Sequence, residues 1–157
     1  MYVGFLPIGG RDPPGFFMNL SSKTQYACLA MLELAQHYQL GEPMQARRIA
    51  QRHGIPPSFL VQILQDLKRA GLVTSVRGAA GGFLLSRPPE NLSLAELLDV
   101  VEGPQDATCA ASESPLAVVL TDICHERAAV RRERLEAISL ADLLERSTVD
   151  SASMWYI

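Results

Sequence analysis

The sequence predicts a mainly α-helical protein with a small β-ribbon, arranged as a winged helix-turn-helix that is followed by a long C-terminal dimerisation helix. Three observations lead to this prediction. Apolar residues recur at helical spacing through most of the chain. Two short helical stretches are joined by a tight turn that begins with a glycine, and a glycine-rich hairpin follows them. A later helical stretch is much longer than the others.

Length and composition limit the class of protein. The 157 residues, 48% of them hydrophobic, are enough for one core and an accessory element. No apolar run approaches the roughly 20 residues that cross a membrane, and the first residues lack the basic start of a signal peptide. Three widely spaced cysteines do not form a disulfide framework. We therefore expect a cytoplasmic protein with no membrane partner.

Four segments are expected along the chain. Residues 1–17 are rich in glycine and proline and have no periodicity, so we expect a disordered extension, with Met18 as a natural start. Residues 18–87 are expected to form the winged helix-turn-helix. Residues 88–146 would hold a sensing loop and the dimerisation helices, and residues 147–157 would form a tail.

Residues 19–22 are expected to lead into the first predicted helix. Ser22 and Gln25 have the spacing of a capping box, and Gly41 ends the helical region. Its apolar stripe includes Ala27, Ala30, Met31, Leu34 and Ala35. Cys28 borders this stripe, and we interpret it as a small buried hydrophobic residue.

The helix-turn-helix is predicted between residues 45 and 69. A helix over about Gln45–His53 is followed by Gly54, which allows the left-handed turn that ends helices. Pro57 suits the first position of the second helix, which runs to about Arg69. That helix is expected to bury Leu60, Ile63, Leu64 and Leu67.

A wing follows the second helix. Residues 72–76 are predicted to form a strand, residues 77–82 a turn, and residues 83–85 the returning strand. Arg77 lies at the glycine-flanked tip. Gly78, Gly81 and Gly82 would let the tip turn and would let its backbone approach a phosphate, although an ordinary hairpin would need them too.

Positive charge is concentrated on this segment. Between residues 44 and 86 there are six basic residues and one acid, Asp66, whereas the whole chain has a net charge of −3. DNA affinity depends largely on neutralising phosphates, so a local basic face indicates nucleic-acid binding better than total charge does. Ordinary solvated helix faces are the alternative, but they do not explain why charge, motif and wing coincide.

The C-terminal part contains three further helices. Ser93 and Glu96 form a second capping box, and a loop with Cys109 covers about residues 105–114. The longest helix is predicted over Pro115–Glu136. Its apolar stripe comprises Leu116, Val119, Leu120 and Ile123, is interrupted at Arg127, and resumes at Val130 and Leu135. Ser139 and Asp142 would cap a last short helix.

The long helix predicts a homodimer, because a small DNA-binding domain leaves little core to cover its stripe. The alternative is that this helix packs back on its own domain.

Several motifs resemble the IscR/NsrR-like family of bacterial winged-helix transcriptional regulators. They are LSSKTQYACLAMLELA, the helix-turn-helix block and the wing VRGAAGGF, and together the resemblance spans about residues 18–147. It implies a dimeric repressor or activator on a palindromic operator in double-stranded DNA. It also implies that Arg77 enters the minor groove and that Lys23 and Tyr26 lie near the phosphate backbone.

The candidate base contacts are Ser58, Phe59 and Gln62, at the start of the second helix of the motif. A glutamine amide can pair its donor and its acceptor with adenine, and an arginine at a wing tip can reach a narrow minor groove. Val61 stands where iron–sulfur members of the family can carry a base-discriminating glutamate. A thymine methyl would suit this valine, so no operator sequence is inferred.

The sensing region departs from the cluster-binding members, which carry three cysteines and a further ligand between the helix after the wing and the long helix. Only Cys109 matches. With Cys124 and His125, an iron–sulfur cluster would still lack a ligand, so cofactor and metal remain unknown. Three interpretations stay open: a cluster completed by a partner subunit, a thiol switch at Cys109 alone or with Cys124, or residues without a sensing role. A small-molecule or protein effector is also open.

Other function classes fit less well. The three histidines lie on separate elements and no nucleotide fingerprint occurs, so we do not expect an enzyme. A winged-helix module that binds a partner protein is the stronger rival. DNA binding should weaken steeply with salt, whereas a hydrophobic protein contact should barely respond.

Overall fold

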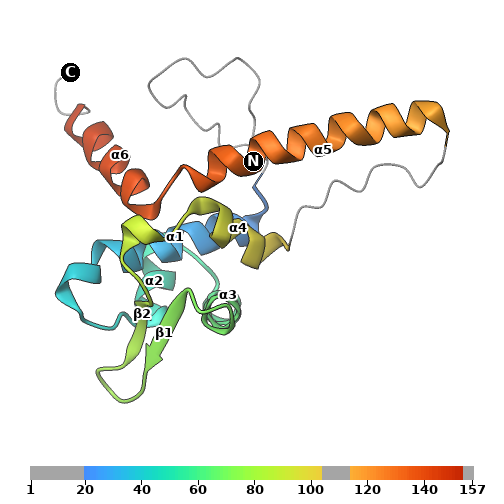
Figure 1. The fold of residues 1–157 in the computed structure, drawn as a ribbon. Coiled ribbons are helices and arrows are strands. Elements are labelled where there is room, and N and C mark those ends of the chain that lie inside the picture. Colours follow the sequence, from blue (N-terminus) through green and yellow to red (C-terminus); the bar gives the residue numbers. More distant parts are fainter. Residues whose placement is uncertain (1–19, 104–113, 154–157) are drawn as a thin grey trace.

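The computed structural model describes residues 20–103 and 114–153, and for residues 149–153 it describes the backbone only. The expectations for residues 1–17, for the loop around Cys109 and for the last four residues lie outside the described residues. Figure 1 shows the element order. The elements are α1 (Ser22–Gln36), the short helix η1 (Tyr38–Leu40), α2 (Ala46–His53), α3 (Pro57–Arg69), β1 (Val73–Val76), β2 (Gly82–Leu85), η2 (Pro89–Asn91), α4 (Leu94–Glu102), α5 (Pro115–Glu136) and α6 (Leu140–Ser153).

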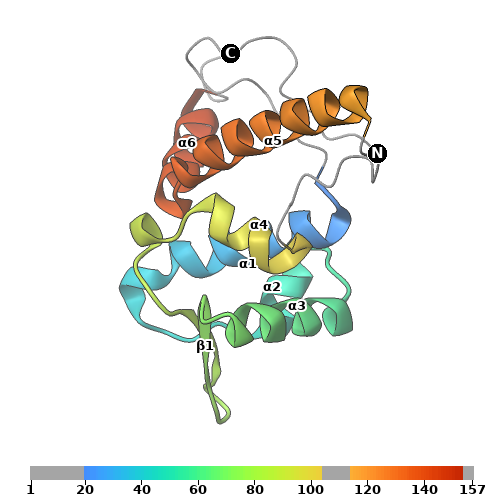
Figure 2. The ribbon, with the colours of Figure 1, turned by 45° about the vertical axis from the view of Figure 1, so that its right-hand side comes forward.

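The helices are arranged in layers. In Figure 2, α1 and α4 lie in the middle, α5 and α6 lie on one side of them, and α2, α3 and the hairpin lie on the other. The buried core joins the inner faces of these layers. Its fully buried large side chains include Met31, Ile49, Leu60, Ile63, Leu64, Leu67, Leu92, Leu97 and Leu140.

The turn between α2 and α3 forms as predicted. Gly54 has a φ of 64°, a left-handed conformation that favours glycine, and its N–H caps the end of α2. Pro57 occupies the first turn of α3, where its missing N–H leaves no hydrogen bond unmade. The predicted apolar positions of α3, Leu60, Ile63, Leu64 and Leu67, are buried.

The wing is an antiparallel hairpin in which Val73 pairs with Leu85 and Val76 with Gly82. It is also joined to the start of the helix-turn-helix. The Met44 N–H donates to the Phe83 carbonyl at 2.9 Å, and the Phe83 N–H donates to the Met44 carbonyl at 2.8 Å. These two bonds hold β2 against Met44, shortly before α2.

The predicted cap of the first helix is wrong by one residue. Ser21, not Ser22, is the N-cap, and its side chain accepts from the Thr24 N–H at 3.2 Å. Gln25 instead donates to the Leu20 carbonyl at 3.1 Å. Two adjacent serines offered two registers, and the helix begins at the second serine. Gly41 ends η1 rather than α1, which stops at Gln36.

The capping boxes of the later helices form as predicted. Ser93 accepts from the Glu96 N–H at 3.2 Å while the Glu96 carboxylate accepts from the Ser93 N–H at 3.3 Å. Ser139 and Asp142 make the equivalent pair at the start of α6. However, α6 runs to Ser153, so part of the segment expected to be a tail is helical.

Helix α5 has two faces of different character. Ala117 and Leu135 are buried, and Thr121, Cys124, Ala128 and Arg131 at helical spacing between them are half-buried. Leu116, Val119, Leu120, Ile123 and Val130 lie on another face and are all at least half exposed. The sequence suggested that Leu135 continues the stripe at Val130, and this prediction is wrong. Leu135 packs in the core of its own chain because it lies on the other face.

In the part of the chain that the structure describes, no helix combines the length and apolar character that crossing a bilayer would require.

Candidate DNA-binding interface

The exposed side of α3 contains the candidate base contacts. Ser58, Phe59 and Gln62 are all exposed, while the opposite side of the helix is buried. Phe59 packs edge-on against Tyr26 of α1, with ring centroids 5.9 Å apart. This contact places Tyr26 beside the start of α3, so that residues 33 positions apart in the sequence share one surface.

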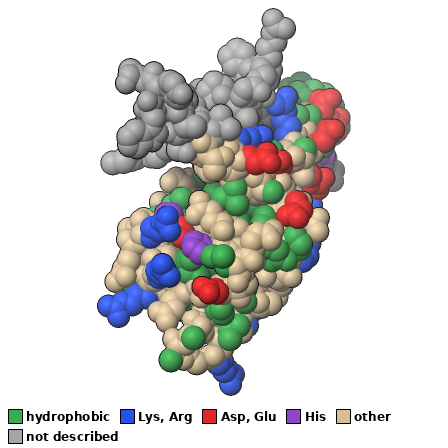
Figure 3. Space-filling view, turned by 90° about the vertical axis from the view of Figure 1, so that its left-hand side faces the viewer, with side chains coloured by type: hydrophobic (Ala, Val, Ile, Leu, Met, Phe, Trp, Pro, Cys, Tyr) green, Lys and Arg blue, Asp and Glu red, His purple; other side chains and the backbone are tan. Residues whose placement is uncertain are grey.

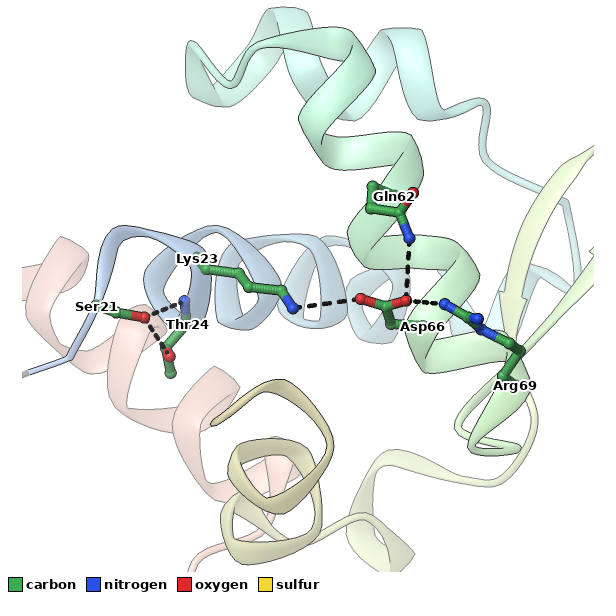
Figure 4. A network of polar contacts seen from close by, with 6 residues as sticks. All are labelled: Ser21, Lys23, Thr24, Gln62, Asp66 and Arg69. Carbon is green, nitrogen blue, oxygen red and sulfur yellow. Dashed lines mark hydrogen bonds and ion pairs between the residues drawn. The ribbon is translucent and has the colours of Figure 1, made fainter. Parts of the chain in front are cut away.

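Lys23 joins the same surface through Asp66, as Figure 4 shows. The Lys23 ammonium lies 3.3 Å from the Asp66 carboxylate. Gln62 donates to the same carboxylate at 3.1 Å, and Arg69 pairs with it as well. Partial burial raises the pKa of Asp66, but the hydrogen bonds from Arg69, Lys23 and Gln62 outweigh this effect and hold that pKa below its ordinary value.

The wing tip lies at the far end of the hairpin. Arg77 is exposed there, and Gly78 has a φ of 110°, which a residue with a side chain rarely adopts. A Cβ on Gly81 would overlap with the Val76 carbonyl oxygen, and one on Gly82 would overlap with the Met44 carbonyl oxygen. Gly82 therefore serves the contact between β2 and Met44. Gln45 also donates to the Ala79 carbonyl at the tip, at 3.2 Å.

Three exposed arginines near this surface make no ion pair with the described residues. They are Arg47 and Arg48 on α2 and Arg77 on the wing. In Figure 3, Lys and Arg side chains project at the lower end and at the lower left edge of the molecule. Unpaired cations on a protruding surface are available to neutralise phosphates.

A buried carboxylate fixes α2 against α1. Glu33 is 4% exposed, and it accepts from Arg52 at 2.7 Å and lies 3.0 Å from His53 Nε2. His37 bonds the Glu33 backbone carbonyl at 2.9 Å. Two of the basic residues in the segment thus have a structural partner, since Arg52 is paired with Glu33 and Arg69 with Asp66.

The structure brings five of the nine candidate DNA contacts together on the surface of α1 and α3, namely Lys23, Tyr26, Ser58, Phe59 and Gln62. Arg77, Gly78, Gly81 and Gly82 are in the wing. Sequence reasoning noted Asp66 only as the single acid and missed its three partners. A signal existed in the spacing of Gln62, Asp66 and Arg69, which places them on one helix face.

The candidate sensing residues are not brought together by the described part of the chain. Cys109 lies outside it. Cys124 is half-buried on the α5 face that carries Ala117 and Leu135, and His125 is exposed. Neighbouring residues on a helix point in different directions. Within residues 20–103 and 114–153 there is no group of three His, Cys, Asp or Glu side chains arranged to hold a metal ion.

Cys28 lies next to the apolar stripe of α1, as expected from the sequence, and is half-buried. Burial, with a smaller contribution from the negative charge of Glu102, raises the pKa of its thiol to about 12. The reactive thiolate is therefore scarce at neutral pH.

Residues 20–146 match the family model Rrf2, described as an iron-dependent transcriptional regulator. The chain belongs to the Rrf2 family. Proteins named as transcriptional regulators are similar along most of the chain. ORF2 of Azotobacter vinelandii, which bears the name of an HTH-type transcriptional regulator, is 41% identical over 140 residues, which are 84% of this chain and 82% of ORF2.

Solved structures of regulators share the fold. CymR of B. subtilis, named the global cysteine regulator, superimposes with a TM-score of 0.69 at 30% identity, covering 83% of this chain and 98% of CymR. IscR of T. potens also gives a TM-score of 0.69, at 33% identity, covering 83% and 88% of the two chains. The mainly helical winged-helix fold and the function of a DNA-binding transcriptional regulator, both predicted from the sequence, are confirmed.

Proposed function

We propose that this Rrf2 protein is a homodimeric transcriptional regulator that binds a palindromic operator. Helix α3 enters the major groove, and Ser58, Phe59 and Gln62 contact base edges. Arg77 enters the adjacent minor groove, while Lys23 and Tyr26 lie against the phosphate backbone. Bound at a promoter, such a dimer represses or activates transcription.

The observation that carries this proposal is the exposed side of α3 together with a wing that carries an arginine without an ion pair to the described residues. Ser58 and Gln62 are exposed on α3, and Arg77 makes no ion pair with the described residues. The wing is hydrogen-bonded to Met44, shortly before α2, so the wing and the helix-turn-helix are held in one unit. An exposed helix and a basic tip held in one unit can contact two grooves of one duplex.

The exposed face of α5 supports the dimer. The helix has 22 residues and is therefore about 33 Å long. Five apolar side chains on one face are at least half exposed in the single chain. A second copy of α5 would cover them by an isologous contact, in which both subunits use the same face.

Thiol oxidation is the sensing chemistry that we propose, at Cys109 and Cys124. Two thiols and one molecule of hydrogen peroxide give one disulfide and two molecules of water, so the thiols are oxidised and the peroxide is reduced. The alternative is an iron–sulfur cluster with His125 and a partner subunit's ligands. Cys28 is half-buried and its thiol has a raised pKa, so two other cysteines remain, fewer than the about four protein ligands of a cluster.

The sensing proposal is tested with the serine variants Cys109→Ser and Cys124→Ser, and with Cys28→Ala as the control. Peroxide should change the operator affinity of the wild type and of the control but not of the serine variants. Iron and sulfide analysis of anaerobically purified protein tests the alternative. Stoichiometric iron and sulfide would contradict the thiol proposal.

The DNA-binding roles are tested by fluorescence anisotropy on an operator selected from random duplexes. We expect Arg77→Ala to weaken binding about tenfold or more, because it removes a minor-groove contact. Arg87→Ala is the matched control, since Arg87 is paired with Glu96 at 2.9 Å and lies after the hairpin. Equal effects of the two substitutions would contradict the proposed role of the wing.

The rival function is a winged helix that binds a protein partner. Raising the salt concentration from 50 to 200 mM should weaken operator binding steeply, by about 0.9 log units of affinity per log unit of salt for each phosphate contact. A complex that is insensitive to salt would favour the rival.

A further inference from the structure

Asp66 is the one acid on the basic segment between residues 44 and 86, and it lies on α3 among the residues proposed to contact DNA. A carboxylate there repels phosphates, so its presence needs a physical reason. Its side chain is 20% exposed and touches donors from two helices. Lys23 comes from α1, and Gln62 and Arg69 come from α3 (Figure 4).

The contact with Gln62 determines how the amide group is oriented. An ionised carboxylate only accepts hydrogen bonds, so the Gln62 NH₂ group must face Asp66, at 3.1 Å. The lowered pKa of Asp66 keeps its carboxylate ionised at neutral pH. The Gln62 amide oxygen makes no hydrogen bond with the described residues. The oxygen, together with the second N–H of the amide group, therefore remains available to a base.

An amide oxygen distinguishes two of the bases from the other two in the major groove. It accepts from the amino group of adenine or cytosine. Guanine and thymine present oxygen and nitrogen acceptors at these positions, which repel it. A glutamine that is free to rotate would instead turn its NH₂ group toward guanine, and the contact with Asp66 disfavours this rotation because it would break the hydrogen bond to the carboxylate.

The contacts of Asp66 with Lys23 and Arg69 limit the sequence-independent part of DNA binding, which is the attraction between cations and phosphates. Lys23 lies 3.3 Å from the carboxylate, and Arg69 is paired with it directly. Both cations would otherwise be available to any phosphate, whatever the sequence. Pairing them with Asp66 lowers the sequence-independent affinity.

We propose that Asp66 is a specificity-determining positioning residue, which orients Gln62 toward adenine or cytosine and restrains Lys23 and Arg69 from non-specific phosphate binding. Asp66 acts through these three side chains and need not touch DNA itself. This inference rests on the proposed placement of α3 in the major groove.

The test compares the full-length wild type with Asp66→Ala, Asp66→Asn and Gln62→Ala, each by selection from random duplexes and by anisotropy on operator and unrelated DNA. Asp99→Asn is the control, because Asp99 is an acid paired with Arg132 on another surface, at 2.8 Å. Thermal unfolding checks that every variant is folded.

We expect Asp66→Ala and Gln62→Ala to lose base preference at the same operator position, by about tenfold against guanine and thymine. Asp66→Ala should also bind unrelated DNA more tightly. The slope of its log affinity against log salt concentration should be steeper by about 0.9 for each cation released. Asp66→Asn loses the charge but keeps an oxygen that can accept from Gln62. It should bind unrelated DNA more tightly and retain the base preference, so it tests the charge effect even if Asp66→Ala fails to fold.

Unchanged base preference in folded Asp66→Ala, while Gln62→Ala loses it, would overturn the proposal for Asp66 alone. An equal loss of affinity for all sequences would show a purely structural role and would overturn it too. If Gln62→Ala and Arg77→Ala both bind DNA like the wild type, the placement of α3 and the wing fails instead. The two failures are therefore distinguishable.

Discussion

The DNA-binding half of the molecule, residues 20–103, differs from α5 in how its apolar residues are used. In the DNA-binding half the inner face of α3 is fully buried, with Leu60, Ile63 and Leu64 at 0% exposure. In α5, Ile123 is 56% exposed and Leu116 is 83% exposed. Apolar side chains thus pack in the core in one region and remain exposed in the other. The first region covers its apolar side chains within one chain, whereas the second leaves them exposed.

The largest effect should come from a charge on the exposed face of α5. We expect Ile123→Glu to weaken dimerisation at least about a hundredfold, because the symmetric contact places two unpaired carboxylates in an apolar interface. Analytical ultracentrifugation over a range of concentrations measures the dissociation constant. Ala129→Glu is the control, since Ala129 is exposed but lies on neither of the two faces of α5. If Ile123→Glu leaves the sedimentation unchanged, α5 is not the interface.

The second prediction applies one substitution to both regions. Leu64→Ala should lower the free energy of unfolding by about 2–5 kcal/mol at every protein concentration, because it leaves a cavity in a core position at 0% exposure. Leu120 is 51% exposed, so Leu120→Ala should act mainly by weakening the dimer. Its urea midpoint should depend on protein concentration. Similar, concentration-independent losses for both variants would contradict the difference between the two regions.

The third prediction concerns the wing of the DNA-binding half. A Cβ at Gly82 would overlap with the Met44 backbone, so Gly82→Ala must displace β2. We expect a loss of about 1–3 kcal/mol in the free energy of unfolding, together with weaker operator binding. Chemical denaturation and anisotropy measure the two effects. Ala80→Ser, at the exposed tip, should change neither by much. A stable Gly82→Ala protein with weak binding would show that the wing moves without unfolding.

The smallest effect should come from Glu96 at the start of α4. The hydrogen bond donated by Arg87 is the largest cause that lowers the pKa of Glu96 below its ordinary 4.5, against a smaller opposing effect of burial. Its stabilisation is fully present above pH 4.5 and is lost as the pH falls through the lowered pKa. Glu96→Gln keeps a capping side chain but loses the ion pair. It should cost less than about 1 kcal/mol at pH 7.

This pH dependence can be followed by urea denaturation between pH 3 and pH 7. The stability curves of the wild type and Glu96→Gln should converge in acid. A difference that persists below the lowered pKa would indicate that the packing, rather than the charge, of Glu96 is important.

Local patterns in the sequence predicted much of the fold. The period of α3, the glycine after α2 and the capping box at Ser93 depend only on residues a few positions apart, and each formed as expected. Two adjacent serines before α1 were ambiguous because both suit an N-cap, and the structure uses Ser21. The division of α5 into two faces was partly missed, since Leu135 and Val130 are both apolar and only the fold separates them.

Long-range contacts were not predictable from the sequence alone. Lys23 and Asp66 are 43 positions apart, and Glu33 lies 19 and 20 positions before its partners Arg52 and His53. Each pair forms because α1 packs against the helix-turn-helix. The resemblance indicated a role for Lys23 near phosphates, but its restraint by Asp66 needed the arrangement of the helices. The roles of the candidate DNA contacts stay predictions.

The hydrogen bonds between Met44 and Phe83 have a consequence for the target DNA. They join the wing to the start of the helix-turn-helix, so we expect the distance between the wing tip and α3 to be constant. If both are inserted in DNA, the base pairs that they contact must be separated by one constant spacing within each half-site. An inserted base pair inside a half-site would then be tolerated far less than one at the centre of the palindrome, where only the contact between the two subunits sets the length.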